Sequence, residues 1–240
     1  MSTPSLSAEM ISRLLAETYP SYQATSLTDL NLGFGFLFYG LTRLLRPERI
    51  LVIGSKAGFS VVLFALGLKD NLGAGIKNVL CYDTEIEEVQ KPRKVFFVDP
   101  SFCADRNDSC HWYGIGFWDD EDRVRKHWDA FGVADFVSHH KMTSAEFLKH
   151  PDCRNFDLVY IDGDHSREGI LHDFNEYHPL LGENAIVLAH DVDPRLKEMD
   201  QGTGGYEALC QLDPTKYEVC RLPIFPGLAI ARRLQPDAVS

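Results

Sequence analysis

The chain has few cysteines for its length, no dense cysteine pattern and no long apolar run at its start. Its six cysteines are spread through 240 residues, so a small disulfide-stapled scaffold is not expected. The first ten residues, MSTPSLSAEM, lack the basic-then-apolar sequence of a signal peptide. We therefore expect a protein of the reducing cytoplasm.

Long apolar segments and an excess of basic residues are also missing. The longest apolar stretches, Phe34 to Leu41 and Val61 to Leu68, are far shorter than the roughly 20 residues that cross a bilayer. Lys and Arg total 24 against 35 Asp and Glu, a net charge of −11, which suits neither a phosphate backbone nor an anionic membrane. We expect a soluble protein with no nucleic-acid or membrane partner.

Short apolar runs alternate with amphipathic segments along the chain, and no internal repeat interrupts them. The runs expected as strands are Ile50–Gly54, Val95–Val98, Asp135–Ser138, Leu158–Ile161 and Ala185–Ala189. The segments expected as helices between them are Phe59–Leu68, Glu121–Phe131, Ser144–His150 and Arg167–Leu181. Uniformly apolar strands that alternate with helices predict a doubly wound parallel sheet.

The two ends of the chain complete this sheet. Tyr217–Leu222 and Leu228–Arg232 are separated by a short proline-containing turn, which predicts an antiparallel pair at the sheet edge. Ala8–Glu17 and Gly35–Leu45 predict an N-terminal helical cap over residues 1–45. The expected fold is therefore a single α/β domain, residues 1–240, with a Rossmann-like, mostly parallel seven-stranded sheet, an antiparallel edge strand and a candidate lid insertion at residues 100–131.

The turn after the first strand, Gly54-Ser-Lys-Ala-Gly58, feeds directly into a helix. The dinucleotide fingerprint G-x-G-x-x-G would need glycine where the chain has Lys56 and Phe59, so NAD binding is disfavoured. Two glycines alone are equally consistent with a tight strand-to-helix turn that binds no ligand. Asp99 at the end of the second strand favours a nucleoside, because its carboxylate can accept both ribose hydroxyls.

Four segments together resemble a known family: ILVIGSKAGFS, FFVDP, FDLVYIDGDHSREGILHDFNEYHPLLGENAIVLAHDV and GLAIARR. They look like a class I S-adenosylmethionine-dependent methyltransferase, in the small O-methyltransferase-like branch with an IDGDHSYEGV-type signature, related to macrocin and catechol O-methyltransferases. The resemblance covers about residues 35–235. Its most specific part is IDGDHSREG followed by AHDV.

The resemblance implies a binding site for S-adenosylmethionine. The residues expected to line it are Gly54, Ser55, Lys56, Gly58, Asp99, Met142, Thr143, Ser144 and Asp162. The family commonly has glycine where this chain has Lys56, whose ammonium either pairs with the cofactor carboxylate or points to solvent. Thr143 also begins a capping-box sequence, Thr-Ser-Ala-Glu, which predicts a helix start there.

The resemblance also implies a divalent metal, such as Mg or Mn, at Asp162, His190 and Asp191. The imidazole of His190 suits Mn, Fe or Zn better than Mg, and a site without metal remains an alternative. His165 stands where the family has a lysine base, and an imidazole can serve as general base near neutral pH. Asp162 and His165 are the expected catalytic residues. Asp164 fits a helix cap better than a catalytic role.

The sequence thus predicts methyl transfer from S-adenosylmethionine to a hydroxyl of a small metabolite. Two alternatives share the fold: a hydroxylase or other non-transferase enzyme, and a non-catalytic cofactor-binding partner protein. Cys103, Cys110 and His111 lie close in sequence, but without a C-x-x-C pair they do not predict a zinc site. The sequence leaves the oligomeric state open, a homo-oligomer included.

Overall fold

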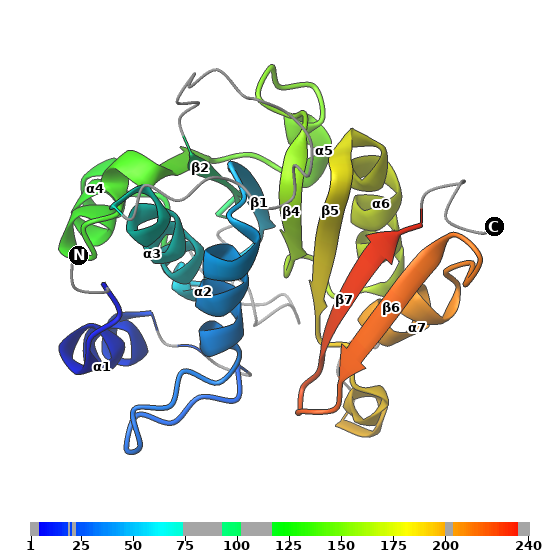
Figure 1. Ribbon diagram of the computed structural model, residues 1–240, viewed down its shortest axis with the longest axis horizontal. Helices are drawn as coiled ribbons and strands as arrows, with labels where there is room; N and C mark the ends of the chain where they lie inside the picture. The colour runs from blue at the N-terminus through cyan, green and yellow to red at the C-terminus, as the bar shows by residue number, and fades with distance from the viewer. Residues whose placement is uncertain are drawn as a thin grey trace.

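A seven-stranded sheet forms the centre of the protein, and helices cover both of its faces (Figure 1). The computed structural model describes residues 5–18, 20, 23–73, 93–101, 117–199 and 204–234. The strand order is β3-β2-β1-β4-β5-β7-β6. The strands are β1 Arg49–Ile53, β2 Lys94–Val98, β3 Val137–His140, β4 Phe156–Ile161, β5 Leu181–His190, β6 Tyr217–Leu222 and β7 Leu228–Arg233.

Strands β1 to β5 run parallel, and β7 runs antiparallel to both of its neighbours, β5 and β6. The predicted doubly wound sheet and the antiparallel pair at its edge are confirmed. The reversed strand is β7, which lies one position inside the edge that β6 forms. The parallel strands β1, β2 and β4 are buried almost throughout, which explains their uniformly apolar sequences.

Two hydrophobic cores lie on opposite faces of the sheet. Helices α1 Ala8–Glu17, α2 Phe34–Leu45, α3 Phe59–Gly73 and α4 Glu121–Ala130 pack on one face, and α5 Ser144–Phe147, α6 Arg167–Tyr177 and α7 Gly204–Cys210 pack on the other. The residues of α3 from Val61 to Leu66 are 0% exposed, so this helix is apolar on all sides. The expected N-terminal helices are thus both present, on the α3 face.

The structure shifts β3 relative to the prediction. Ala134–Phe136 form a short 3₁₀ turn, and the strand begins at Val137. The predicted strand began too early because three of the four β3 residues are polar. The apolar residues on which the prediction relied end where the strand begins. The rings of His139 and His140 still pack on apolar partners, Phe97 and Phe147, at centroid distances of 4.7 and 4.8 Å.

Two helices are shorter than predicted. The Thr143 capping box is confirmed, since the Thr143 hydroxyl accepts the Glu146 N–H and the Glu146 carboxylate accepts the Thr143 N–H, but α5 is only one turn long. The predicted helix to Leu181 ends at Tyr177, and His178–Leu180 form a 3₁₀ turn. Proline at position 179 accounts for that end, because it lacks the N–H that an α-helix needs.

Some expectations fall outside the described residues. The candidate lid at residues 100–131 includes residues 102–116, which contain Cys103, Cys110 and His111 and lie outside them. Within the rest of that region, Trp118 is 1% exposed and packs in the core. Among the helices that the structure describes, none has the length and apolar character to cross a membrane.

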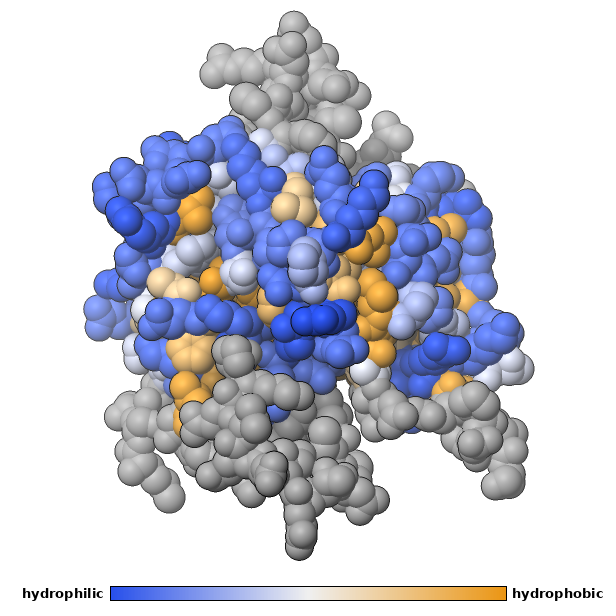
Figure 2. Space-filling view, turned by 90° about the horizontal axis from the view of Figure 1, so that it is seen from above, coloured by the Kyte–Doolittle hydropathy of each residue, from blue (hydrophilic) through white to orange (hydrophobic). Residues whose placement is uncertain are grey.

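The end of the molecule seen from above Figure 1 is mostly hydrophilic, with scattered apolar side chains (Figure 2). The parallel strands run away from this end, and their carboxyl ends lie at the bottom of Figure 1, where the 3₁₀ turn η3, Pro194–Met199, follows β5. Ligands of doubly wound sheets bind at the carboxyl ends. A ligand-binding site is therefore expected at the lower end of the molecule.

Candidate active site

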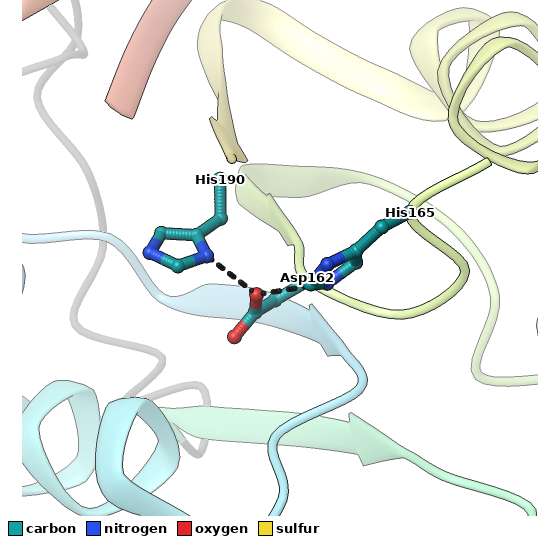
Figure 3. Close-up of side chains that lie close together, drawn as sticks. All are labelled: Asp162, His165 and His190. Carbon is teal, nitrogen blue, oxygen red and sulfur yellow. Dashed lines mark ion pairs between the residues drawn. The ribbon is translucent and has the colours of Figure 1, made fainter. Parts of the chain in front are cut away.

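Two neighbouring strands bring acidic and imidazole groups together at their carboxyl ends (Figure 3). Strand β4 ends at Ile161, which pairs with Ala189 of β5, so Asp162 and His190 leave the sheet side by side. Asp191 follows in a left-handed backbone conformation with φ +54°. The turn after β4 then returns His165 toward the same point.

Two carboxylates and two imidazoles form one cluster. His190 Nδ1 lies 3.0 Å from Asp162 Oδ1 and 3.0 Å from Asp191 Oδ1. His165 Nδ1 lies 2.6 Å from Asp191 Oδ2, and its Nε2 lies 3.4 Å from Asp162 Oδ1. The structure therefore brings together all four residues that the sequence singled out at these strand ends.

The carboxylates control the charge on both histidines. Burial opposes a charge on His190, but Asp162 and Asp191 raise its pKa to about 10. Burial likewise opposes a charge on His165, yet its hydrogen bonds to the same carboxylates raise its pKa well above 6.5. Burial would raise the pKa of the two acids, and the histidines instead lower it. These mutual shifts favour a cluster in which the imidazoles carry the positive charges and the carboxylates the negative ones.

This protonation sets a condition on the predicted base. Both ring nitrogens of His165 face a carboxylate, which favours its protonated form, and a protonated His165 can accept another group's proton only after releasing its own. The side chain of His165 is 36% exposed, against 3% for His190. His165 is therefore the member of the cluster that a ligand reaches most easily, and its role as base remains a prediction.

The donor atoms fit a divalent cation. One ligand atom each from Asp162, His165 and His190 lie within 4.8 Å of one another, so a small closure would bring them to the ligand distances of about 2.0–2.2 Å that zinc, for example, requires. Two imidazoles with a carboxylate suit Mn, Fe or Zn better than Mg. The metal ligands expected from the sequence were Asp162, His190 and Asp191, whereas the group that the structure brings together has His165 in place of Asp191. In the structure Asp191 contacts both histidines, which is how an outer carboxylate orients metal-binding imidazoles.

Both glycines of the turn between β1 and α3 are required by its geometry. Gly54 has φ +73°, and a Cβ there would lie 2.5 Å from the Asp162 carbonyl oxygen. Gly58 has φ +80°, and a Cβ would lie 2.9 Å from Trp128 and 3.0 Å from Trp118. The turn thus passes directly beside Asp162. Its other members, Ser55 and Lys56, are buried and exposed respectively, and the Ser55 hydroxyl lies 2.9 Å from that of Ser60.

Asp99 is tied to the same turn. Its carboxylate accepts the Ser101 N–H at 2.7 Å and also the Ser55 N–H. Burial raises its pKa, and these two hydrogen bonds work in the opposite direction. Met142, Thr143 and Ser144 lie one strand further along, where Met142 lines a surface groove of about 380 Å³ with the flanking lysines Lys141 and Lys149. That these residues bind a cofactor remains a prediction.

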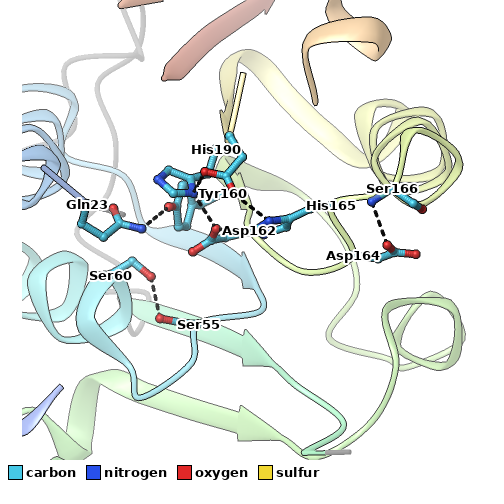
Figure 4. A network of polar contacts seen from close by, with 10 residues as sticks. Gln23, Ser55, Ser60, Tyr160, Asp162, Asp164, His165, Ser166 and His190 are labelled. Carbon is cyan, nitrogen blue, oxygen red and sulfur yellow. Dashed lines mark hydrogen bonds and ion pairs between the residues drawn. The ribbon is translucent and has the colours of Figure 1, made fainter. Parts of the chain in front are cut away.

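The structure adds two residues that the sequence reasoning missed (Figure 4). Gln23 Nε2 lies 3.4 Å from the Tyr160 hydroxyl, and burial and the nearby Asp162 carboxylate raise the pKa of that hydroxyl. Tyr160 stands on β4, two residues before Asp162, which directly follows that strand, so period-two alternation could have placed both on the same face. Nothing in the sequence pointed to Gln23.

The structural interpretation of Asp164 is confirmed. Its carboxylate accepts the Ser166 N–H at 2.9 Å, and the Ser166 hydroxyl caps α6 by accepting the Gly169 N–H at 3.0 Å. Asp164 and Ser166 thus hold the start of α6 next to the cluster (Figure 4). Asp164 thus supports the N-cap residue Ser166, and a functional role for Asp162 remains a prediction.

Comparison with known proteins gives a family match. Residues 51–192, more than half of the chain, match the model of a family described as a methyltransferase domain. No curated protein matched the chain. Solved structures share its fold. The O-methyltransferase TomG of Streptomyces achromogenes, involved in tomaymycin synthesis and solved with S-adenosylmethionine, is 16% identical, with a TM-score of 0.58 over 98% of this chain and 92% of that one.

Two further structures are similar to the same extent. A methyltransferase of Podospora anserina, bound to S-adenosylhomocysteine, is 17% identical with a TM-score of 0.60, over 95% of this chain and 88% of that one. An O-methyltransferase of Bacillus cereus in complex with S-adenosylhomocysteine is 14% identical with a TM-score of 0.60, over 94% of this chain and 91% of that one. At these identities the likeness concerns the fold.

Proposed function

Because the chain belongs to the methyltransferase-domain family, we propose that it transfers the methyl group of S-adenosylmethionine to a hydroxyl oxygen of a small metabolite. The observation that carries this proposal is the convergence of three features at one end of the sheet. These are the glycine turn, the Asp99 carboxylate and the cluster of Asp162, His165, His190 and Asp191. Solved relatives of the same fold, named above, contain this cofactor or its demethylated product.

Each feature has a part in binding. The glycine turn keeps a tight path between Asp162 and Trp128, because a Cβ at either glycine would collide with the surrounding protein, and that path would border the cofactor. Asp99, already positioned by two backbone N–H groups, offers its carboxylate to the ribose hydroxyls. Lys56 is exposed on the turn and either pairs with the cofactor carboxylate or remains in solvent. Met142, Thr143 and Ser144 would then lie beside the adenine.

The reaction needs positioning more than activation, because the sulfonium methyl is already reactive. The acceptor oxygen attacks the methyl carbon, the carbon–sulfur bond breaks, and S-adenosylhomocysteine leaves with both electrons of that bond. The acceptor proton must go to a group of the cluster. In its described state the cluster is a poor acceptor for that proton, because the imidazoles favour their protonated form and the carboxylates have a lowered pKa, so His165 would first have to release its own proton.

A divalent cation would make the acceptor hydroxyl easier to deprotonate. Asp162, His165 and His190 would hold it, and the ion would lower the pKa of an acceptor hydroxyl. The same set of two imidazoles and one carboxylate is found in non-haem iron oxygenases, which makes a hydroxylase the second candidate. Formation of a hydroxylated product that requires iron and oxygen, with no S-adenosylhomocysteine released, would favour the hydroxylase.

We further propose that the protein works in the cytoplasm, because its cysteines are widely spaced in the sequence. Three of them, Cys153, Cys210 and Cys220, are free thiols in the described part of the chain. Its partner is a small-molecule acceptor. A homo-oligomer is compatible with the proposal and is not required by it.

Cofactor binding tests the proposal directly. We expect calorimetry to show binding of S-adenosylmethionine and none of NAD. Asp99→Ala should weaken the binding by about 1.5–3 kcal/mol, the contribution of a hydrogen bond to a charged group. Asp99→Asn keeps an oxygen for the Ser101 N–H and should weaken it less. The control is Asp129→Ala, at an exposed aspartate of α4, and affinity that is equal in all four proteins would contradict the assignment.

Metal binding is tested by proton release. Because the carboxylates raise the pKa of both histidines, that of His190 to about 10, Mn²⁺ that uses them as neutral ligands should displace at least one proton at pH 7. Calorimetry in two buffers with different ionisation enthalpies measures that number, and Mg²⁺ should bind more weakly. Mn²⁺ binding without proton release would contradict the imidazole ligands. Methyl transfer that persists in chelator would instead remove the metal from the mechanism and leave the transferase proposal intact.

A further inference from the structure

A phenol hydroxyl lies buried beneath the cluster. Tyr160 is 0% exposed, and its ring packs against Phe38, Phe64 and His190 at centroid distances of 4.9, 5.9 and 6.4 Å. A phenylalanine would supply the same ring contacts. The hydroxyl must therefore be accounted for by its own partners, because an unpaired polar atom at this depth is destabilising.

The hydroxyl has a donor and an acceptor beside it. A phenol has a single proton to donate, and Asp162, two residues further along the chain and on the same face, is a carboxylate whose charge adds to burial in raising the pKa of the hydroxyl. Its oxygen accepts an N–H of the Gln23 amide at 3.4 Å. The Gln23–Tyr160 hydrogen bond thus lies next to the ion pairs of Asp162 with His165 and His190 (Figure 4), and a hydrogen bond from Tyr160 to Asp162 would join the two.

Gln23 is itself held in place by the segment before α2. Its main-chain oxygen accepts the Phe34 N–H at 2.9 Å. Gly33 has φ +52°, and a Cβ there would lie 2.0 Å from that oxygen, so only glycine allows this approach. The Phe34 ring meets His190 edge-on at 6.0 Å. The N-terminal segment is therefore built against the cluster and does not merely cover the sheet.

The buried amide of Gln23 lowers the stability of the fold. Gln23 is 6% exposed, and within the described part of the chain its amide oxygen has no hydrogen-bond partner. A buried acceptor without a donor destabilises a fold, and an apolar side chain of similar volume would avoid this. The N–H that reaches Tyr160 is the feature of Gln23 that an apolar side chain cannot supply.

We propose that Tyr160 is a positioning residue, whose hydroxyl is held by Gln23, donates its proton to Asp162 and so fixes that carboxylate between His165 and His190. Asp162 Oδ1 is the one oxygen that faces both histidines. A carboxylate can rotate about its last side-chain bond, and a hydrogen bond from the phenol limits that rotation. The inference rests on the proposed function only for its effect on methyl transfer, because the placement of Asp162 is a property of the protein alone.

The test compares two tyrosines that both donate to a carboxylate. Tyr160→Phe removes the bond to Asp162, and Tyr39→Phe removes a 2.7 Å bond to Asp70 between α2 and α3. We expect Tyr160→Phe to shift the imidazole ¹⁵N signals of His165 and His190 in the cofactor-free protein. It should also lower the kcat of methyl transfer about 10- to 100-fold and leave the affinity for S-adenosylmethionine within a factor of two. Tyr39→Phe should change none of these.

Gln23→Met, which keeps volume and removes the N–H, gives a second variant that does not depend on the folding of Tyr160→Phe. It should shift the same ¹⁵N signals by a smaller amount. Unchanged signals in both variants, or equal changes in Tyr39→Phe, would overturn the positioning role. Shifted signals in a protein that methylates no hydroxylated acceptor would retain the positioning of Asp162 and reject the transferase proposal.

Discussion

His190 carries a positive charge at a position that is almost sealed from water. Its side chain is 3% exposed, and a lone imidazolium there would lose its proton. The two carboxylates 3.0 Å away reverse that preference and raise its pKa to about 10. A single residue is therefore both part of the core, where it meets Phe34 and Tyr160, and a charged member of the site.

The raised pKa of His190 predicts how stability depends on pH. The folded pKa of about 10 lies above the unfolded value of about 6.5. The stabilisation is therefore complete below pH 6.5 and is lost as pH rises through 10. Between pH 7 and 9 the free energy of unfolding of the metal-free protein should fall, by at most about 1.4 kcal/mol per pH unit for this one proton. Urea unfolding at several pH values measures it.

His190→Gln should lower stability at pH 7 and make this decline shallower. His172→Gln, at an exposed histidine of α6, is the matched control and should keep the slope of the original protein. Two other buried groups titrate outside the range of pH 7 to 9, because burial raises the pKa of Asp173 to about 6 and that of Cys153 to about 11. A slope that is identical in His190→Gln and the original protein would show that His190 does not carry the proton.

At the scale of elements, the turn between β1 and α3 depends on two tryptophans from outside it. The indole rings of Trp118 and Trp128 stack 5.1 Å apart at an angle of 15° and occupy the space into which a Cβ of Gly58 would project. The turn is thus confined on its outer side by an aromatic wall and on its inner side by Asp162. Its path cannot change without a change in one of them.

Gly58→Ala should therefore destabilise the protein. The left-handed φ alone costs about 1–2 kcal/mol for a side chain, and the contacts of 2.9 and 3.0 Å with the indoles add to it. Gly40→Ala is the opposite case, because no atom lies within 4 Å of its Cβ and it lies within helix α2. That change should stabilise by about 0.5–1 kcal/mol. Urea unfolding of both variants measures the difference, and equal effects would contradict the role assigned to the aromatic wall.

The elements also show how far the sequence could predict the fold. Strands buried on both faces, such as β1 and β4, were found because nothing but apolar residues fits there. Strand β3 was misplaced by two residues because its sequence, Val-Ser-His-His, is polar, and only its packing on Phe97 and Phe147 makes those histidines core residues. The capping box at Thr143 gave a correct helix start, but no local signal limited α5 to one turn.

At the scale of the whole molecule, topology explains why the cluster could be predicted. Parallel strands that are neighbours in a sheet deliver their following residues to the same place, so the convergence of Asp162 with Asp191 followed from the strand order alone. The pairing of His165 with both carboxylates did not follow, because it depends on the path of a turn. The contact of Gln23 with Tyr160, 137 residues apart, was beyond any local pattern.

The order of strands β5, β7 and β6 has a consequence for the synthesis of the chain. Strand β7 is the last strand along the described chain, yet it occupies the position between β5 and β6. While a ribosome is still making the protein, β5 has an open edge, and β6 has no strand of the sheet to pair with. His190 pairs with Leu228 across that edge. The strand that carries His190 into the cluster is thus secured only when residues 228–233 have emerged, and until then the half-built sheet presents an edge that other chains can join.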